Sequence, residues 1–271
     1  MFTCVDIFIK FLSPVLPVGQ VLIAFGTGTA GMFWLMASTT RQPILDKRYF
    51  HKATIFRCIS EMVGGLALVV ALSNSALSIV TAIMQTAPLV LTIMAAVFLK
   101  EVIGVSRIAA IIFGFLGVLI IIRPSAGELD IYAVCALVGV IGLAGRDFSA
   151  RLLPDDVSVI GLSFYGSLFV ILSGLLLMIV TGGWVLPNSK EIFYCVAMAA
   201  CGGVGLWCMS TSIRLADVSA VSPYRYTRII FGMVAGVIIF DEKIDVLTIF
   251  GALIIVGAGL YGWSRERIHS V

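Results

Sequence analysis

Nine long apolar runs divide the sequence, and each has about the length of a membrane-crossing helix. Such a helix needs roughly 20 residues to cross the hydrocarbon core of a bilayer, and charged side chains near its centre are strongly disfavoured. We expect spans at Val18–Met36, Ile55–Ser73, Ala76–Leu99, Val105–Ile122, Ile131–Ser149, Val157–Val180, Ile192–Ile213, Ser219–Phe240 and Val246–Trp263, preceded by a short apolar piece at Met1–Leu12.

The composition supports this membrane assignment. Only 12% of the residues are charged and 60% are hydrophobic, whereas roughly a quarter of a soluble domain is charged. The sequence has no alternating strands at ten-residue spacing, which argues against an outer-membrane barrel. Because the bilayer core offers backbone groups no water, helices are the structure that remains. The sequence predicts an all-α polytopic membrane protein of about ten transmembrane helices, the first of them truncated.

The basic residues of the loops predict an orientation, since Lys and Arg concentrate in cytoplasmic loops. If Met1–Leu12 starts inside, the inside loops and tail hold Arg41, Lys47, Arg48, Lys52, Arg57, Lys100, Arg107, Arg146, Arg151, Arg214, Arg265 and Arg267. The outside loops hold only Lys10, Arg123, Lys190 and Lys243. We expect a multi-pass protein of a bacterial inner membrane with both termini in the cytoplasm.

An internal repeat organises the spans. A shift of 141 residues brings the two halves into register, and the charged pairs that coincide are Asp6 and Asp147, Lys10 and Arg151, and Glu101 and Glu242. Each half holds five spans, so the second half must insert upside down, as in many secondary transporters. We expect one repeat at 1–123, with helices 1–5, and one at 129–264, with helices 6–10. Only five residues precede Asp6, so the first helix is expected to be short.

The arrangement and its motifs resemble the drug/metabolite transporter superfamily, and within it the EamA-type permeases of bacteria. The motifs that carry the resemblance are Asp6-x-x-x-Lys10, Gln85–Thr86–Ala87–Pro88, Leu99–Lys100–Glu101, Gly117–Val118–Leu119, Arg123–Pro124, Pro223–Tyr224–Arg225–Tyr226–Thr227–Arg228 and Phe240–Asp241–Glu242. The short first helix departs from the pattern, and so does Ala24–Phe25, where many relatives carry an Arg. The Tyr–Arg–Tyr–Thr–Arg stretch is most similar to riboflavin permeases, and next to S-adenosylmethionine uptake proteins. The resemblance implies secondary transport of a small metabolite.

Two arginines lie in the middle of an expected span. Arg225 and Arg228 follow Ser219 by six and nine residues, and a charged residue at a helix centre costs about 2.5–3.5 kcal/mol on insertion scales. Their repeat equivalents are uncharged. We expect Arg225, Arg228 and Tyr224, which shares a helix face with Arg228, to bind substrate. The alternative is that one arginine pairs with Glu61 or caps carbonyl groups of a neighbouring helix.

Two further polar residues are expected to line the same site. Gln85 lies opposite Tyr226 in the repeat alignment, and Pro88 follows it. A proline removes a backbone hydrogen bond and can kink a helix, which exposes a carbonyl group to a cavity. We expect Gln85 to hydrogen-bond the substrate, or else a neighbouring helix, and Tyr226 to stack against a planar ring.

Three acidic residues are candidates for ion pairing or for coupling. Glu61 lies within the third span and is expected to pair with an arginine, or to bind a proton and so couple transport to it. Asp6 and Asp147 each precede a basic residue by four positions. We expect each to form an ion pair within its own helix, with a gate role as the alternative.

A polytopic membrane protein of this kind can be an enzyme, a channel or scaffold, or a transporter. A membrane enzyme would need convergent catalytic groups, but the two histidines, His51 and His269, lie in a loop and in the tail. A channel or scaffold is the non-transport alternative, but channels of this size usually form symmetric oligomers around a pore. A transporter that works by alternating access is therefore expected, with no catalytic residues, no metal and no cofactor. Its expected partners are a small-molecule substrate and membrane lipid, not nucleic acid, and a homodimer is left open.

The expected substrate is riboflavin, taken up into the cell. Arginine can hydrogen-bond its carbonyl and hydroxyl oxygens while tyrosines stack on its ring. The alternatives are S-adenosylmethionine, an amino acid or another metabolite, in either direction of transport.

Overall fold

The computed structural model describes residues 1–271 except 45, 47, 48, 101–103, 124–129, 151, 154–156, 216–224 and 270–271. Of residues 213–215 and 265–269 it describes only the backbone. The described helices are α1 (Phe2–Leu12), α2 (Val18–Thr39), α3 (Lys52–Asn74), α4 (Leu77–Met84), α5 (Ala87–Leu99), α6 (Val105–Ile122), α7 (Ile131–Ala150), α8 (Val159–Thr181), α9 (Ser189–Leu215), α11 (Thr227–Phe240) and α12 (Val246–His269). No strand occurs within these residues.

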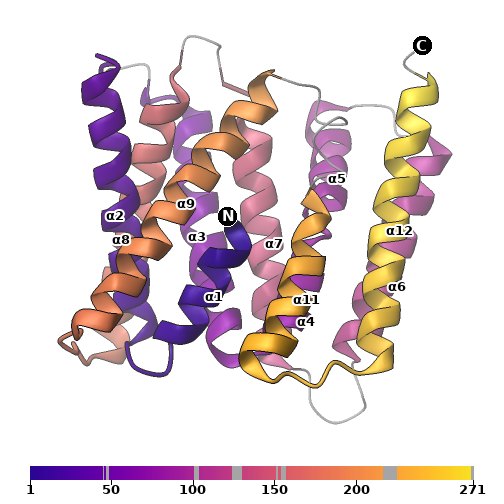
Figure 1. Ribbon diagram of the computed structural model, residues 1–271. Coiled ribbons are helices and arrows are strands. Elements are labelled where there is room, and N and C mark those ends of the chain that lie inside the picture. Colours follow the sequence, from indigo (N-terminus) through magenta and orange to yellow (C-terminus); the bar gives the residue numbers. More distant parts are fainter. Residues whose placement is uncertain are drawn as a thin grey trace.

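The helices confirm a polytopic membrane protein. In the described part of the chain, eight segments are long and apolar enough to cross a membrane, with Leu77–Leu99 counted as one. The helix α11 is a shorter apolar helix, and residues 219–224 of the expected ninth span lie outside the described residues. The helix α1 has 11 residues and begins about midway between the two ends of the bundle (Figure 1). A short first helix was expected from the repeat.

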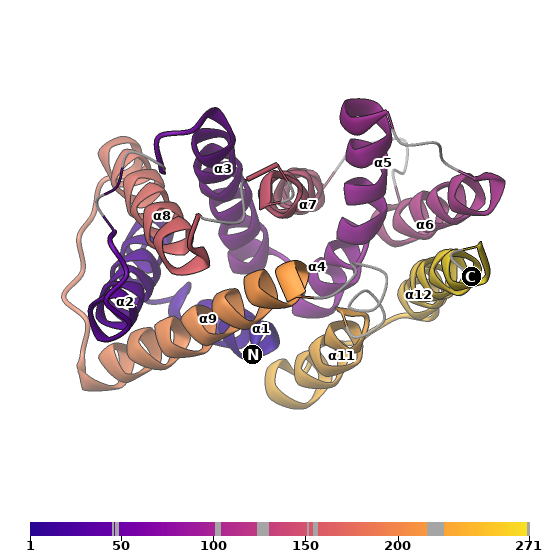
Figure 2. The ribbon, with the colours of Figure 1, turned by 90° about the horizontal axis from the view of Figure 1, so that it is seen from above.

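The helices pack in the pattern that an inverted repeat gives. Seen from above, α2 and α8 lie at one end of the molecule, α6 and α12 at the other, and the remaining helices between them (Figure 2). Each end pair joins a helix to its own repeat equivalent. The contact of α2 with α9 corresponds to that of α8 with α3, and the contact of α3 with α7 to that of α9 with α1.

Glycines allow the two end pairs to cross closely. A Cβ on Gly19 of α2 would lie 2.7 Å from the carbonyl oxygen of Gly174 of α8, and the reverse distance would be 2.6 Å. Gly117 of α6 and Gly251 of α12 face one another in the same way, at 2.7 Å in both directions. Small residues at such crossings bring backbones together, which is the main source of helix association in lipid. A methyl group at any of the four positions would force the pair apart.

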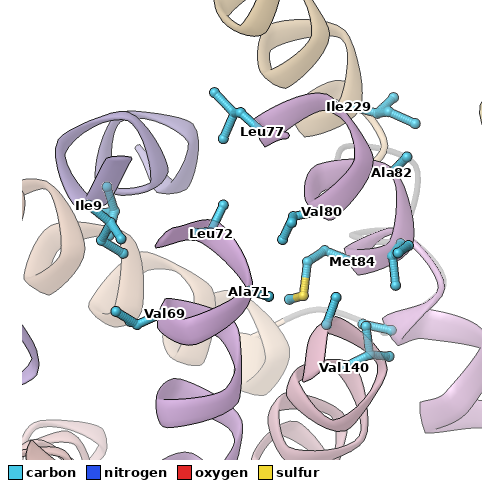
Figure 3. Packing of buried hydrophobic residues seen from close by; sticks show 14 of the residues in the cluster. Ile9, Val69, Ala71, Leu72, Leu77, Val80, Ala82, Met84, Val140 and Ile229 are labelled. Carbon is cyan, nitrogen blue, oxygen red and sulfur yellow. The ribbon is translucent and has the colours of Figure 1, made fainter. Parts of the chain in front are cut away.

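Apolar side chains of α1, α3, α4, α7 and α11 meet in the middle of the bundle (Figure 3). Leu72 of α3 and Leu77 of α4 are fully buried there, and Val140 of α7 and Ile229 of α11 are almost fully buried. Lipid tails are as apolar as these side chains, so the cluster stabilises the fold by close van der Waals packing. It joins helices of both halves beside the polar site described below.

The fourth expected span is broken between α4 and α5. The amides of Gln85 and Thr86 donate hydrogen bonds to carbonyl groups three residues back, at 3.1 and 3.0 Å, which is the tighter 3₁₀ pattern. Pro88 lies in the first turn of α5, where its missing N–H interrupts no helical hydrogen bond. The kink expected before Pro88 is confirmed, as a break between two helices. This break leaves Gln85 at the wall of the central cavity.

Candidate substrate cavity

A cavity of about 440 Å³ lies among the central helices, within the size range of small-molecule sites. Its charged lining residues are Asp6 of α1, Glu61 of α3, Arg146 of α7, Arg225, and Arg228 of α11. Its aromatic lining residues are Phe2, Phe25 and Phe231. Four helices that are distant in sequence thus bring charged groups to one intramembrane space, with flat apolar rings beside them.

Arg228 and Asp6 form one closed ion pair across the two halves. The Nη2 of Arg228 lies 2.8 Å from Oδ1 and 2.7 Å from Oδ2 of Asp6, and Nε lies 3.1 Å from Oδ2. The Asp6 side chain is 2% exposed, whereas that of Arg228 is 18% exposed. The guanidinium also lies over the ring of Phe2, 5.6 Å from its centroid. Arg228 is therefore held by its partner but still reaches the cavity.

Asp147 of α7 is shared between two arginines. Its Oδ1 accepts hydrogen bonds from Nε and Nη2 of Arg146 at 3.0 and 2.9 Å. Its Oδ2 accepts one from Nη2 of Arg225 at 3.1 Å. Asp147 is itself buried and does not line the cavity, while both arginines do. The buried Asp147 carboxylate therefore holds the guanidinium groups of Arg146 and Arg225 at the wall of the cavity.

Glu61 of α3 has one engaged and one unengaged carboxylate oxygen. Its Oε1 lies 3.7 Å from Nη1 of Arg146. Its Oε2 is buried and has no hydrogen-bond partner among the described residues. This oxygen points at Gly166 of α8, where an added Cβ would lie 2.1 Å away. A buried carboxylate oxygen without a donor is costly in an apolar setting, and Gly166 leaves the space that this oxygen occupies.

Gln85 lines the cavity as expected, and it also fixes the start of the α11 segment. Its Nε2 donates a hydrogen bond of 2.5 Å to the backbone carbonyl of Arg225. The Gln85 side chain therefore bonds a neighbouring element, which was the stated alternative to a substrate contact. Its place in the cavity wall keeps the substrate contact open.

Tyr226, the expected stacking residue that the structure describes, lies away from the cavity. Tyr226 is 4% exposed and its ring lies against Gly259 of α12, where an added Cβ would be 1.7 Å from the hydroxyl oxygen. It does not line the cavity, although its neighbours Arg225 and Thr227 do. Its expected stacking role is therefore not supported by its position. Tyr224 lies outside the described residues.

Arg57 of α3 lies beside Arg146 in the charged region around the cavity, although from the sequence it was expected only as a charge of a cytoplasmic loop. Its side chain is almost fully buried. Its Nη1 lies 3.3 Å from the carbonyl oxygen of Arg146 and its Nη2 lies 3.4 Å from Oγ of Ser210. Its Nε has no hydrogen-bond partner among the described residues. The signal that was available in the sequence is its spacing: Arg57 precedes Glu61 by four residues, on the same face of one helix.

The ion pairs differ from those expected within single helices. Asp6 does not pair with Lys10, which instead bonds Glu242 at 2.6 Å. The expected pair of Asp147 with Arg151 lies outside the described residues; within them, Arg146 and Arg225 hold the Asp147 carboxylate. Glu61 pairs with an arginine, but with Arg146 and not with Arg225 or Arg228. The i, i+4 expectation for Asp6 is wrong because a bidentate arginine from the other half offers a stronger partner.

The region as a whole carries a slight excess of positive charge. Its four guanidinium groups belong to Arg57, Arg146, Arg225 and Arg228, and its three carboxylates to Asp6, Glu61 and Asp147. Three carboxylates against four cations leaves one positive charge within the described residues. Intramembrane ionisable residues of this kind mark substrate or ion pathways. The arrangement offers charged groups of both signs to one cavity.

Comparison with known proteins places this geometry in a family context. The chain is 25% identical over 181 residues to the S-adenosylmethionine uptake transporter of Rickettsia conorii, a match that covers 67% of this chain and 61% of that protein. It is 23% identical over 176 residues to the riboflavin transporter of Vibrio cholerae, covering 65% and 58%. The chain thus spans less than two thirds of the length of these curated relatives.

A solved structure shows that the fold has been seen before. One crystal structure of a protein covers 98% of this chain and 96% of its own chain, with a TM-score of 0.68 at 15% sequence identity. The family model described as the EamA-like transporter family matches residues 1–123 and again residues 130–261. Because these two matches take in most of the sequence, the chain belongs to the EamA-like transporter family.

Proposed function

We propose that this chain is a secondary transporter whose substrate is a small metabolite that carries a carboxylate, a cationic group and a planar ring. The single observation that carries the proposal is the polarity of the cavity, which is lined by Arg225 just before α11, by Arg228 on α11 and by Glu61 on α3. Intramembrane charge of both signs around a 440 Å³ space matches a zwitterionic ligand.

The arginines are the proposed carboxylate site. The side chain of Arg225 is 20% exposed and gives one hydrogen bond to Asp147. A guanidinium has five N–H donors in a planar fork that matches a carboxylate. A substrate carboxylate that enters the cavity can therefore bond Arg225 without displacing Asp147.

Glu61 is the proposed cation site. Glu61 lines the cavity, and a substrate ammonium or sulfonium group beside it would offset the charge of the carboxylate. The rings of Phe2, Phe25 and Phe231 supply apolar faces for an aromatic base or ring. This combination favours S-adenosylmethionine, which joins an amino acid and a sulfonium group to adenine. The similarity to S-adenosylmethionine uptake transporters supports the same choice.

Riboflavin is the second candidate. The riboflavin transporter of Vibrio cholerae is among the relatives, and the Tyr–Arg–Tyr–Thr–Arg stretch favours it. The position of Tyr226 against Gly259 removes one of the rings that were expected to stack on the isoalloxazine. A neutral flavin would also leave Oε2 of Glu61 without a cation. Riboflavin therefore stands behind S-adenosylmethionine.

The proposed cycle is alternating access in a bacterial inner membrane, with the halves 1–123 and 129–264 moving against one another around the cavity. The proposed orientation, with both termini in the cytoplasm, follows the excess of basic residues on one side. In this orientation the α1–α2 and α11–α12 connections, which lie together at one end of the bundle, face outwards (Figure 1). The proposed direction is uptake, as in the Rickettsia relatives.

The proposal is tested by uptake of labelled S-adenosylmethionine and labelled riboflavin into cells that express the chain and lack their own carriers. We expect saturable uptake of S-adenosylmethionine, lost in Arg225→Gln and in Glu61→Gln at matched expression. Arg123→Gln is the control, because Arg123 is an exposed arginine outside the cavity. Saturable riboflavin uptake alone would replace the substrate with the second candidate. Uptake of both that is unchanged in Arg225→Gln and Glu61→Gln would refute the proposed site.

A further inference from the structure

One polar cluster lies at the end of the bundle where α1 ends, α4 begins and α11 passes to α12 (Figure 1). Glu242, in the α11–α12 connection, bonds Nζ of Lys10 through Oε1 at 2.6 Å. The same oxygen accepts the backbone N–H of Leu77 at 2.6 Å, and Oε2 accepts the backbone N–H of Ser78 at 3.0 Å and its hydroxyl at 2.7 Å. Lys10 also donates to the carbonyl of Ser75 at 2.9 Å. We call Lys10, Glu242, Leu77 and Ser78 the latch.

The latch caps a helix with a residue of the other half. The first N–H groups of a helix have no partner within it, and its N-terminus favours a negative charge. The N-cap residue of α4, Ala76, has no side chain that can serve. Glu242 supplies the missing acceptor from a position 165 residues away. The N-terminus of a helix is usually capped by a residue next to it in sequence. The cap of α4 comes from the other half, so it can be withdrawn when the two halves separate.

The carboxylate of Glu242 is strongly held in its ionised form. Partial burial raises the pKa of Glu242, but hydrogen bonds from Lys10, Ser78 and Leu77 outweigh it and lower the pKa below the ordinary value of 4.5. Lys10 further lies 5.3 Å from the ring centroid of Phe240. The latch is thus a charged, multiply bonded contact at neutral pH.

The latch lies next to the cavity that carries the candidate site. Ile9, which precedes Lys10, lines the cavity. Close packing continues along α4 and α11: a Cβ on Gly232 would lie 2.5 Å from Oγ1 of Thr81, and one on Gly236 would lie 2.6 Å from Oε2 of Glu242. Both glycines give room for α4 side chains and for the latch itself. At this end of the bundle, the first half (α1, α4) and the second half (α11, Glu242) are therefore joined by direct contacts.

We propose that the latch is a gate of the transport cycle: it closes the cavity at this end, and it opens when Glu242 withdraws from Lys10 and from the first turn of α4. The gate rests on the proposed transport cycle but not on any particular substrate. Glu242 belongs to the second half and bonds both Lys10 of α1 and the first turn of α4. Its release therefore frees α1 and α4 together from the second half.

Cysteine accessibility tests the gate without substrate. Cys208 of α9 lines the cavity, and it is kept while Cys4, Cys58, Cys135, Cys195 and Cys201 are replaced by alanine. A membrane-impermeant maleimide is applied to sealed vesicles of both orientations, and a separate Asp245→Cys variant reports which membrane face the latch occupies. We expect Glu242→Gln to raise the labelling rate of Cys208 from the latch face by about tenfold, the shift expected from losing a charge-assisted hydrogen bond.

Asp245→Asn is the matched control, because Asp245 is an acid of the same connection that caps α12 and pairs with the exposed Arg123. It should label as the parent does. Labelling of Glu242→Gln at the parent rate from the latch face would overturn the gate, as would an equal rise in Asp245→Asn.

Two further variants separate the ion pair from the helix cap. Lys10→Met keeps the three bonds from Glu242 to α4, so its rise in labelling should be smaller than that of Glu242→Gln. Lys10→Glu with Glu242→Lys restores an ion pair but leaves α4 uncapped, and it should label like Glu242→Gln. Full recovery in this double variant, or a larger effect of Lys10→Met, would contradict the role given to the cap. Side-dependent labelling without uptake of either candidate substrate would overturn the proposed substrate and leave the gate standing.

Discussion

Asp6 and Asp147 occupy equivalent positions in the two repeats, but they are bound differently. Asp6 holds one arginine, Arg228, in a bidentate pair that joins the two halves. Asp147 divides its two oxygens between Arg146 and Arg225, which both belong to the second half. The two aspartates are therefore equivalent in the repeat, but the arginines that bind them differ in number and in the half from which they come. Asp6 links the halves, whereas Asp147 shapes one wall of the cavity.

The largest effect is expected from Asp147→Asn. The substitution leaves Arg225 without its carboxylate and Arg146 with only the 3.7 Å contact to Glu61. Breaking a buried ion pair by removing one partner costs about 3–5 kcal/mol, and the unfolding temperature in detergent should fall accordingly. Asp6→Asn, which leaves one arginine unpaired, should lower it less. An equal or larger fall in Asp6→Asn would contradict the difference between the two acids.

A smaller effect is expected from exchanging the charges of the cross-half pair. Asp6→Arg with Arg228→Asp restores the ion pair in the opposite sense and should recover part of the stability that Asp6→Asn loses. The matching exchange, Asp147→Arg with Arg225→Asp, should recover none, because the new arginine would face Arg146. Thermal unfolding of the four variants measures the contrast. Recovery in both exchanges would show that Asp147 acts as a simple pair.

The pH dependence of the latch is expected to be smaller still. The pKa of Glu242 is lowered in the folded state, so its contribution to stability is fully present above its ordinary value of 4.5 and is lost as the pH falls through the folded pKa. The stability gap between the parent and Glu242→Gln should therefore be constant near neutral pH and close in acid. A gap that widens as the pH falls would have the wrong sign.

The smallest effect is expected from Asp245→Asn at the same end of the bundle. Hydrogen bonds from Thr248 and Arg123 lower the pKa of Asp245 to about 2, but the pair with Arg123 is exposed. Exposed ion pairs contribute little, and asparagine can still cap α12. The unfolding temperature should not change measurably. A clear fall would mean that the α11–α12 connection as a whole, and not Glu242 in particular, fixes this end.

The spans and the repeat could be predicted from the sequence because apolar length and register are local or periodic signals. The expected span Val105–Ile122 coincides with α6, and the interruption before Pro88 was foreseen. The partners of the charged residues could not be predicted, since Asp6 meets Arg228 only when two halves are folded together. The sequence offers Asp6 a neighbour in its own helix, Lys10 at i+4. In the folded bundle Asp6 instead pairs with Arg228, because a bidentate arginine is the stronger partner.

Arg57 and Tyr226 show the same limit in opposite directions. Arg57 was assigned to the positive loop cluster, yet it is buried between α3, α7 and Ser210 of α9. Tyr226 was assigned to the cavity by its motif and by its place opposite Gln85 in the repeat, yet its ring packs against Gly259 in the middle of α12. Residues adjacent in a motif point in different directions, and only the packing of the whole bundle shows which of them reach the cavity.

The facing glycines of the end pairs have a mechanical consequence. At Gly19–Gly174 and Gly117–Gly251 the two backbones meet directly, so the helices of each pair can turn against one another at the crossing without moving apart. Each end pair joins one helix of the first half to its equivalent in the second, and its crossing can serve as a pivot between the halves. We expect the helices between the two end pairs to undergo the largest displacement in the transport cycle. The spacing of α2 from α8 and of α6 from α12 should stay constant.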